Sequence, residues 1–253
     1  MTQIDDIKKI LEIADKHLKE QNYTEAQKYL EQAKNLDPTS WAIQNNLGII
    51  YKKKGQYQNA IDIYQKIIDK NPYIPEPHNN LANIFKEIGL IKKSENSYLK
   101  ALKLRPNSIE YLFNLAVFYS DTGNTKEAEI YYKKILENQP NNFHIYYQLS
   151  NIKKDILNDQ LKNKIIASEK GKITKQNLAY LFFVKSKFNF KDKNYKQEFD
   201  NLVKGHNYLL ESSNQQYKNN IDYWLTKLPK YIKKFKNYKI YGYQKDFKPI
   251  FIF

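Results

Sequence analysis

The sequence lacks cysteine entirely and contains only one methionine and four histidines among its 253 residues. Without thiols, disulfide frameworks, thiolate catalysis and cysteine-based zinc sites are excluded. The four histidines (His17, His78, His144 and His206) lie in separate segments, so no histidine-rich metal site is expected. We therefore predict a chain with no metal site; we also find no catalytic motif in it.

Long apolar runs are missing as well. No uncharged apolar stretch reaches the roughly 18 residues that a membrane-spanning helix needs. Residues 1–10 alternate charge and isoleucine, unlike the basic and then apolar segments of a secretory signal. From these two features we expect a cytoplasmic protein with no membrane partner.

The formal net charge is +15, but 41 of the 42 basic residues are lysine. Lysine, asparagine, isoleucine and tyrosine together make up 120 residues, a bias typical of A/T-rich codons that weakens a functional reading of the total. The distribution along the chain is more informative. Residues 1–142 carry 20 basic and 18 acidic residues, whereas residues 143–253 carry 22 and 9. This contrast predicts a domain boundary near residue 142.

A period of about 34 residues organises the first part of the chain. Prolines recur at this spacing, and so do glycines between them: Pro38, Pro72, Pro106, Pro140, and Gly55, Gly89, Gly123. A third pattern repeats in phase, of which the clearest copy is Leu47-Gly48-x-x-Tyr51, Ala60-x-x-x-Tyr64, Pro72. These features predict pairs of antiparallel helices: small residues allow close approach, glycine turns the chain after the first helix, and proline follows the second.

This pattern resembles the tetratricopeptide repeat family, with four copies at 7–40, 41–74, 75–108 and 109–142. The resemblance implies an all-α, right-handed helical solenoid with a concave groove built mainly from the first helix of each pair. The domain plan is then four repeats in 1–142, degenerate capping helices in 143–211, and a basic helical linker in 212–253 that ends in a short apolar, strand-like tail.

Amide side chains recur in phase on the first helices. Asn46, Asn80 and Asn114 are spaced by one repeat, and Gln148 continues the row. An amide both donates and accepts hydrogen bonds, so such a row can hold the backbone of an extended peptide. It resembles the asparagine ladder of O-GlcNAc transferases. The alternative is that these asparagines are solvated or bond to the neighbouring helix. Five further residues should flank the same groove: Asn45, Asn79, Asn83, Lys52 and Lys86.

After the repeats, residues 143–157 begin like another first helix but lack the glycine turn and proline. A segment rich in lysine and asparagine leads to Gly171, and two helices are predicted at 178–190 and 196–211. A further amphipathic helix, interrupted by Pro229, is predicted within 212–236.

The order of these pieces resembles bacterial proteins in which tetratricopeptide repeats precede a sulfotransferase domain. Three segments carry the resemblance: Tyr146–Ser150 with Lys153 and Lys154; Leu181–Lys187 with Asn194, Tyr195 and Leu202–Leu209; and Lys248–Phe253. In that family a Pro-Ile-Phe-Ile strand leads into a Gly-x-Pro-Arg-Ser-Gly-Thr loop that holds 3′-phosphoadenosine 5′-phosphosulfate. The chain ends one residue beyond its Pro-Ile-Phe-Ile, so we expect a truncated sulfotransferase without its cofactor site.

Three functions follow from the sequence. The first is an interaction module that recruits an extended peptide or protein partner, as the arm of a sulfotransferase-family protein. The second is a complete transferase, of the protein-tyrosine type, whose catalytic part is missing from this chain. The third is binding of a polyanion by a basic cluster near Trp224 and Tyr231, formed by Lys227, Lys230, Lys233, Lys234, Lys236 and Lys239. Because lysine is common throughout the chain, we favour the first function and do not expect nucleic acid as the partner.

Overall fold

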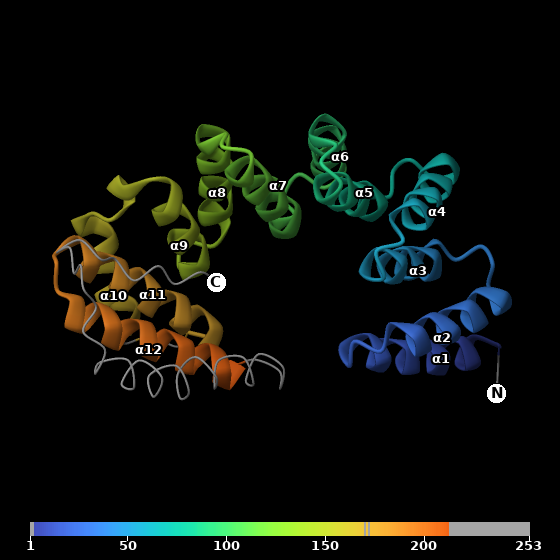
Figure 1. Cartoon of the computed structure of the whole chain (residues 1–253), viewed down its shortest axis with the longest axis horizontal. Coiled ribbons are helices and arrows are strands. Elements are labelled where there is room, and N and C mark those ends of the chain that lie inside the picture. Colours follow the sequence, from blue (N-terminus) through green and yellow to red (C-terminus); the bar gives the residue numbers. More distant parts are fainter. Residues whose placement is uncertain (1–2, 170, 172, 213–253) are drawn as a thin grey trace, which may run out of the picture. The chain divides into compact units, whose positions relative to one another are not determined.

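The computed structural model describes residues 3–169, 171 and 173–212, and these form helices joined by short turns (Figure 1). The prediction of an all-α fold is confirmed. The chain divides into two compact units, one ending at Pro140 and one beginning at Asn141. The predicted helix within 212–236, the basic cluster after Trp224 and the apolar tail Lys248–Phe253 lie outside the described residues.

The first unit consists of four helical hairpins. Their helices are α1 (Gln3–Lys19) with α2 (Tyr23–Leu36), α3 (Trp41–Lys53) with α4 (Tyr57–Lys70), α5 (Pro75–Glu87) with α6 (Ile91–Leu104), and α7 (Ile109–Asp121) with α8 (Thr125–Asn138). Each hairpin also packs on the next through its second helix, α2 on α3, α4 on α5 and α6 on α7. The hairpins therefore stack in chain order, as a solenoid requires.

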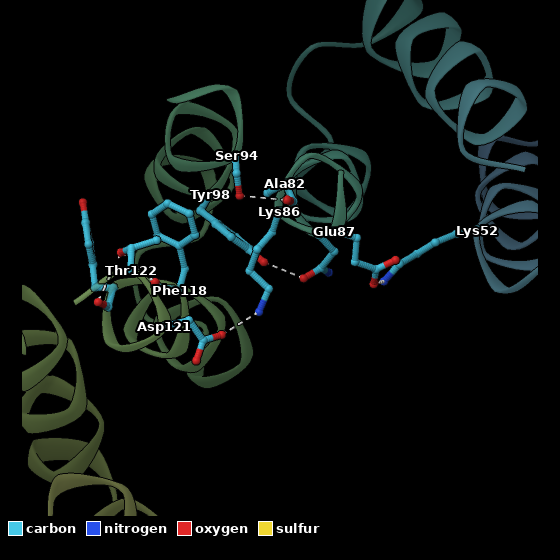
Figure 2. Close-up of polar contacts among 11 residues, drawn as sticks. Lys52, Ala82, Lys86, Glu87, Ser94, Tyr98, Phe118, Asp121 and Thr122 are labelled. Carbon is cyan, nitrogen blue, oxygen red and sulfur yellow. Dashed lines mark hydrogen bonds and ion pairs between the residues drawn. The ribbon is translucent and has the colours of Figure 1, made fainter. Parts of the chain in front are cut away.

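The small residues of the repeat lie where the two helices of a hairpin meet. Ala26, Ala60, Ser94 and Ala128 are fully buried, and Ser94 Oγ donates a hydrogen bond to the Ala82 carbonyl across the α5–α6 interface (Figure 2). Tyrosines fill the space beside them, and Tyr64, Tyr98 and Tyr132 are at most 1% exposed. Because small residues lie beside these tyrosine rings, the two helices of a hairpin can approach closely.

The glycines of the repeat adopt the left-handed backbone conformation that their position after the first helix predicted. Their φ angles are 73° at Gly55, 77° at Gly89 and 80° at Gly123. Two other hairpin turns place a residue with a side chain in the same conformation, Gln21 at 59° and Lys193 at 56°. A residue with a Cβ atom is strained in this region, so glycine is the unstrained choice.

We expect Gly89→Ala to lower the free energy of unfolding by about 1 kcal/mol. An added methyl group at Gly89 would meet no atom within 4 Å, so the cost comes from the backbone conformation alone. The reverse change, Lys193→Gly, should stabilise the chain by a similar amount because Lys193 already lies in the left-handed region. Urea unfolding followed by circular dichroism measures both, and equal stabilities of Gly89→Ala and the parent chain would contradict the explanation.

The second unit contains α9 (Phe143–Ile152), the short 3-10 helix η1 (Lys154–Ile156), α10 (Asp159–Glu169), α11 (Lys175–Lys191) and α12 (Tyr195–Ser212). The two helices predicted at 178–190 and 196–211 are confirmed as α11 and α12, which pack as a hairpin. Helix α10 was not predicted. The buried side of this helix consists of two residues, Leu161 and Ile165. The lysines and asparagines around them obscure the helical period of apolar residues. Asn158 Oδ1 accepts a bond from the Leu161 amide at 3.0 Å, a helix-start signal that the sequence did contain.

Candidate functional site

The predicted amide row is positioned by the first helices of successive hairpins. Asn46, Asn80 and Asn114 each occupy the sixth position of their helix, on α3, α5 and α7, and all three side chains are half-buried. We call the side of α3, α5 and α7 that carries these three residues the amide face. Gln148 occupies the sixth position of α9, in the second unit, where its Nε2 lies 3.1 Å from Nε2 of His144.

Two members of the row bond to the preceding hairpin. Asn80 Nδ2 donates to Asn45 Oδ1 at 2.9 Å, and Asn114 Nδ2 donates to Asn79 Oδ1 at 3.0 Å. Both bonds join residues that are one repeat plus one residue apart. Asn45 and Asn79 are buried, so their carbonyl oxygens need these donors. Part of the amide row therefore holds neighbouring repeats together, as one of the two alternatives from the sequence supposed.

The predicted groove lysines also bond between hairpins. Lys52 Nζ lies 2.8 Å from Glu87 Oε1, and Lys86 Nζ lies 3.1 Å from Asp121 Oδ2, again one repeat plus one residue apart (Figure 2). These ion pairs balance the two lysine charges, so the lysines add no net positive charge to the amide face. Because the pairs are partly exposed, each contributes on the order of 1 kcal/mol or less to stability.

Asn83 joins the two helices of one hairpin. Its Oδ1 accepts a hydrogen bond of 2.6 Å from Tyr98 Oη, which lies on α6. Burial raises the pKa of the Tyr98 hydroxyl, with smaller contributions from Asp121 and Glu87, so this group stays protonated and acts as a donor. Asn83 is thus a support for the packed tyrosine.

Asn46 differs from its equivalents. Leu11 lies one repeat plus one residue before Asn46, where Asn80 and Asn114 have an asparagine, and its side chain has no acceptor. Within the described part of the chain, no hydrogen bond to the Asn46 side-chain amide is found. Asn80 and Asn114 each retain one N–H and the side-chain carbonyl beyond the bond to their neighbour. The amide face therefore presents three uncharged side chains with both donors and acceptors, a chemistry suited to binding polar backbone groups.

Three partners of the predicted residues were not predicted from the sequence: Glu87, Asp121 and Tyr98. Two of these pairs could have been found in the sequence, because Lys52 and Glu87, like Lys86 and Asp121, are separated by one repeat plus one residue.

Among the described helices, none combines the length and the apolarity needed to cross a membrane.

Comparison with known proteins identifies the repeats. The tetratricopeptide repeat family matches residues 7–40, 41–73, 75–108 and 97–130. The predicted tetratricopeptide repeats are confirmed within residues 7–130. No match was found among curated protein sequences.

Two solved structures are similar to this chain. PilF from Pseudomonas aeruginosa is similar with a TM-score of 0.57 and 14% identity, over 86% of this chain and 97% of that protein. A structure of MamA from residue 41 onward, from Desulfovibrio magneticus RS-1, has a TM-score of 0.49 and 13% identity, over 83% of this chain and 98% of that one. At this identity, the similarity to PilF concerns the fold alone.

Proposed function

We propose that this protein is an interaction module whose amide face binds the backbone of an extended peptide. The observation that carries the proposal is the placement of Asn46, Asn80 and Asn114 at one position of three successive first helices, each with amide groups that no other described residue uses. Equivalent amides at a regular interval suit a peptide, whose N–H and C=O groups also recur at a regular interval. The pairs with Asn45 and Asn79 fix the orientation of two of the three amides before a ligand arrives, which lowers the entropic cost of binding.

The charge of this face favours a ligand that is bound through uncharged groups over a ligand that is bound through a carboxylate. Lys52 and Lys86 are the predicted basic residues here, and both are paired with acids. An acidic ligand would have to replace these ion pairs. We therefore expect binding that depends weakly on salt and reads little of the ligand's side-chain sequence.

The test is a selection from a display library of random dodecapeptides against the full chain, followed by affinity measurements on the selected peptides. We expect the triple variant Asn46→Ala, Asn80→Ala, Asn114→Ala to bind them about 100-fold more weakly, since each amide contributes about 1 kcal/mol. N-methylation of the peptide backbone should weaken binding to the parent chain, whereas alanine substitutions in the peptide should matter less. Selected peptides that bind the triple variant as tightly as the parent would disprove the proposal.

Two further variants separate binding from stability. Asn46→Ala removes an amide that bonds to no other described residue, so it should weaken peptide binding without lowering the free energy of unfolding. Asn45→Ala removes the partner of Asn80 and should cost about 0.5–1.5 kcal/mol of stability while all three amides remain. Gln58→Ala on α4, where the side chain bonds to Asp62 in its own helix, is a matched control with no effect on binding.

We also propose that the module belongs to the sulfotransferase-linked group of tetratricopeptide proteins. The order of pieces supports this: a helix resembling the post-repeat helix at α9, a helical hairpin at α11 and α12, and the Pro-Ile-Phe-Ile segment before Phe253. The transferase cofactor would be 3′-phosphoadenosine 5′-phosphosulfate, bound outside this sequence. Reading the gene past the codon for Phe253 tests the proposal. A continuing frame that encodes Gly-x-Pro-Arg-Ser-Gly-Thr supports it, and unrelated sequence contradicts it.

A further inference from the structure

The second unit contains an open pocket of about 500 Å³, separate from the amide face. Residues of α9, of α11 and α12, and of the segment around η1 line it. Its apolar walls are Tyr147, Leu157, Phe190 and Leu202, and the Phe190 ring is 48% exposed. This volume lies within the range of small-molecule sites, which combine apolar walls with a few polar groups.

Three lysines line the same pocket: Lys154, Lys187 and Lys191. Lys187 Nζ donates to the side-chain carbonyl of Asn151, and Lys191 Nζ donates to the backbone carbonyl of Leu157 at 2.9 Å. Lys154 makes no ion pair to any described residue, and neither do the other two. All three positive charges are thus left without a carboxylate partner in the described part of the chain.

Lys187 is the most enclosed of the three. It is half-buried, its Nζ lies 5.1 Å from the centroid of the Tyr147 ring, and burial lowers the pKa of its ammonium group. A desolvated charge is costly unless an opposite charge compensates it. One acid lines the pocket, Glu198, and burial raises the pKa of its carboxyl. Even with Glu198 ionised, three ammonium groups and one carboxylate leave a net charge of +2.

We propose that this pocket binds a small monocarboxylate with an aromatic or branched aliphatic body. The carboxylate would lie at Lys187 and Lys191, which are four residues apart on α11 and therefore on one side of that helix. The body would cover Leu157, Leu202 and the exposed part of Phe190. A strongly hydrated anion such as inorganic phosphate would leave these apolar walls uncovered, so the walls select an anion with an apolar part. The inference does not depend on the peptide-binding proposal, since the two sites share no residue.

Calorimetric titration of the full chain tests the proposal, with isovalerate, benzoate and 3-phenylpropionate as probes. We expect at least one of the three to bind with a dissociation constant on the order of 1 mM or below. The amide of that acid, which has the same shape without the charge, should bind at least about 10-fold more weakly. No binding by any of the three acids, equal binding by acid and amide, or tighter binding of inorganic phosphate would each overturn the proposal.

Variants locate the site. Lys187→Gln and Lys191→Gln should each lower the affinity for the acid about 10-fold, because each removes a charge-assisted hydrogen bond. Lys185→Gln is the matched control: it lies on the same helix but pairs with Glu169 and does not line the pocket, so affinity should not change. Thermal melts establish that each variant is folded, and if Lys187→Gln does not fold, Lys191→Gln decides. Unchanged affinity in a folded Lys187→Gln or Lys191→Gln chain, or an equal loss in Lys185→Gln, would overturn the assignment of the pocket.

Discussion

Tyr98→Ala is expected to lower the free energy of unfolding by about 3–5 kcal/mol. Tyr98 is 1% exposed, and its ring on α6 packs against Phe118 on α7, with centroids 5.6 Å apart. Removing the ring leaves a cavity between two repeats and takes the hydroxyl donor from Asn83 Oδ1. Figure 2 shows Tyr98 near Ser94, Ala82 and Phe118.

The same variant should also reduce the cooperativity of unfolding. The stability of a repeat protein is a sum of terms within repeats and terms between neighbours, and Tyr98 contributes to both. Urea unfolding followed by circular dichroism should show a lower midpoint and a shallower or divided transition. Tyr98→Phe keeps the ring and should cost only about 1 kcal/mol. Tyr73→Ala, at a tyrosine that is 78% exposed, should have an effect below about 0.5 kcal/mol. A similar loss in the Tyr98→Ala and Tyr73→Ala chains would contradict this account.

Gly205→Ala should destabilise the second unit by about 2 kcal/mol, because it overpacks the interface between α11 and α12. Gly205 is a buried residue of α12, and a methyl group there would overlap the Phe183 ring and lie 3.0 Å from the Ala179 carbonyl oxygen on α11. Phe183 has little room to move, because the rings of Tyr147 and His206 lie 5.7 Å and 4.9 Å from it. Overpacking of this kind costs about 1–3 kcal/mol or more, and the helical preference of alanine over glycine returns only about 1 kcal/mol.

A second substitution distinguishes this steric explanation from other causes. Phe183→Leu removes the ring edge that the methyl group would meet, so the double variant Gly205→Ala, Phe183→Leu should lose less stability than the sum of the two single changes. Gly171→Ala is the control, since the nearest atom to its methyl group would be the Ser168 carbonyl oxygen at 3.4 Å. Strictly additive losses in thermal melts would rule out the Gly205–Phe183 contact as the cause.

The fold of the repeats could be predicted because its signals are local. The glycine after a first helix, the proline after a second helix and the small residues at helix crossings all act within a single helical hairpin. Gly55, Gly89 and Gly123 adopt the predicted conformation, and α11 and α12 begin and end within a few residues of the predicted bounds. Helix α10 was not predicted because its two buried residues, Leu161 and Ile165, are too few to show a helical period among lysines and asparagines.

The candidate site could be predicted only in part. The period placed Asn46, Asn80 and Asn114 at equivalent positions, because equivalence follows from spacing alone. It did not indicate that Asn80 bonds to Asn45 or that Lys86 pairs with Asp121, since these partners lie one residue further away than the repeat itself. Spacing alone does not show which residue of one first helix meets which residue of the next, because this depends on how the helices pack and on the direction in which helical side chains lean.

The sequence alone determined the repeat, the helical hairpins and the row of amides, because each depends on residues close together along the chain or on their regular spacing. Only the tertiary structure decided which of those amides are used between hairpins and which remain available to a ligand. It also brought Lys154, Lys187 and Lys191 to one pocket with Tyr147 and Leu202. These residues come from four separate segments, and their meeting depends on how α9, α11 and α12 pack, a property with no period along the chain.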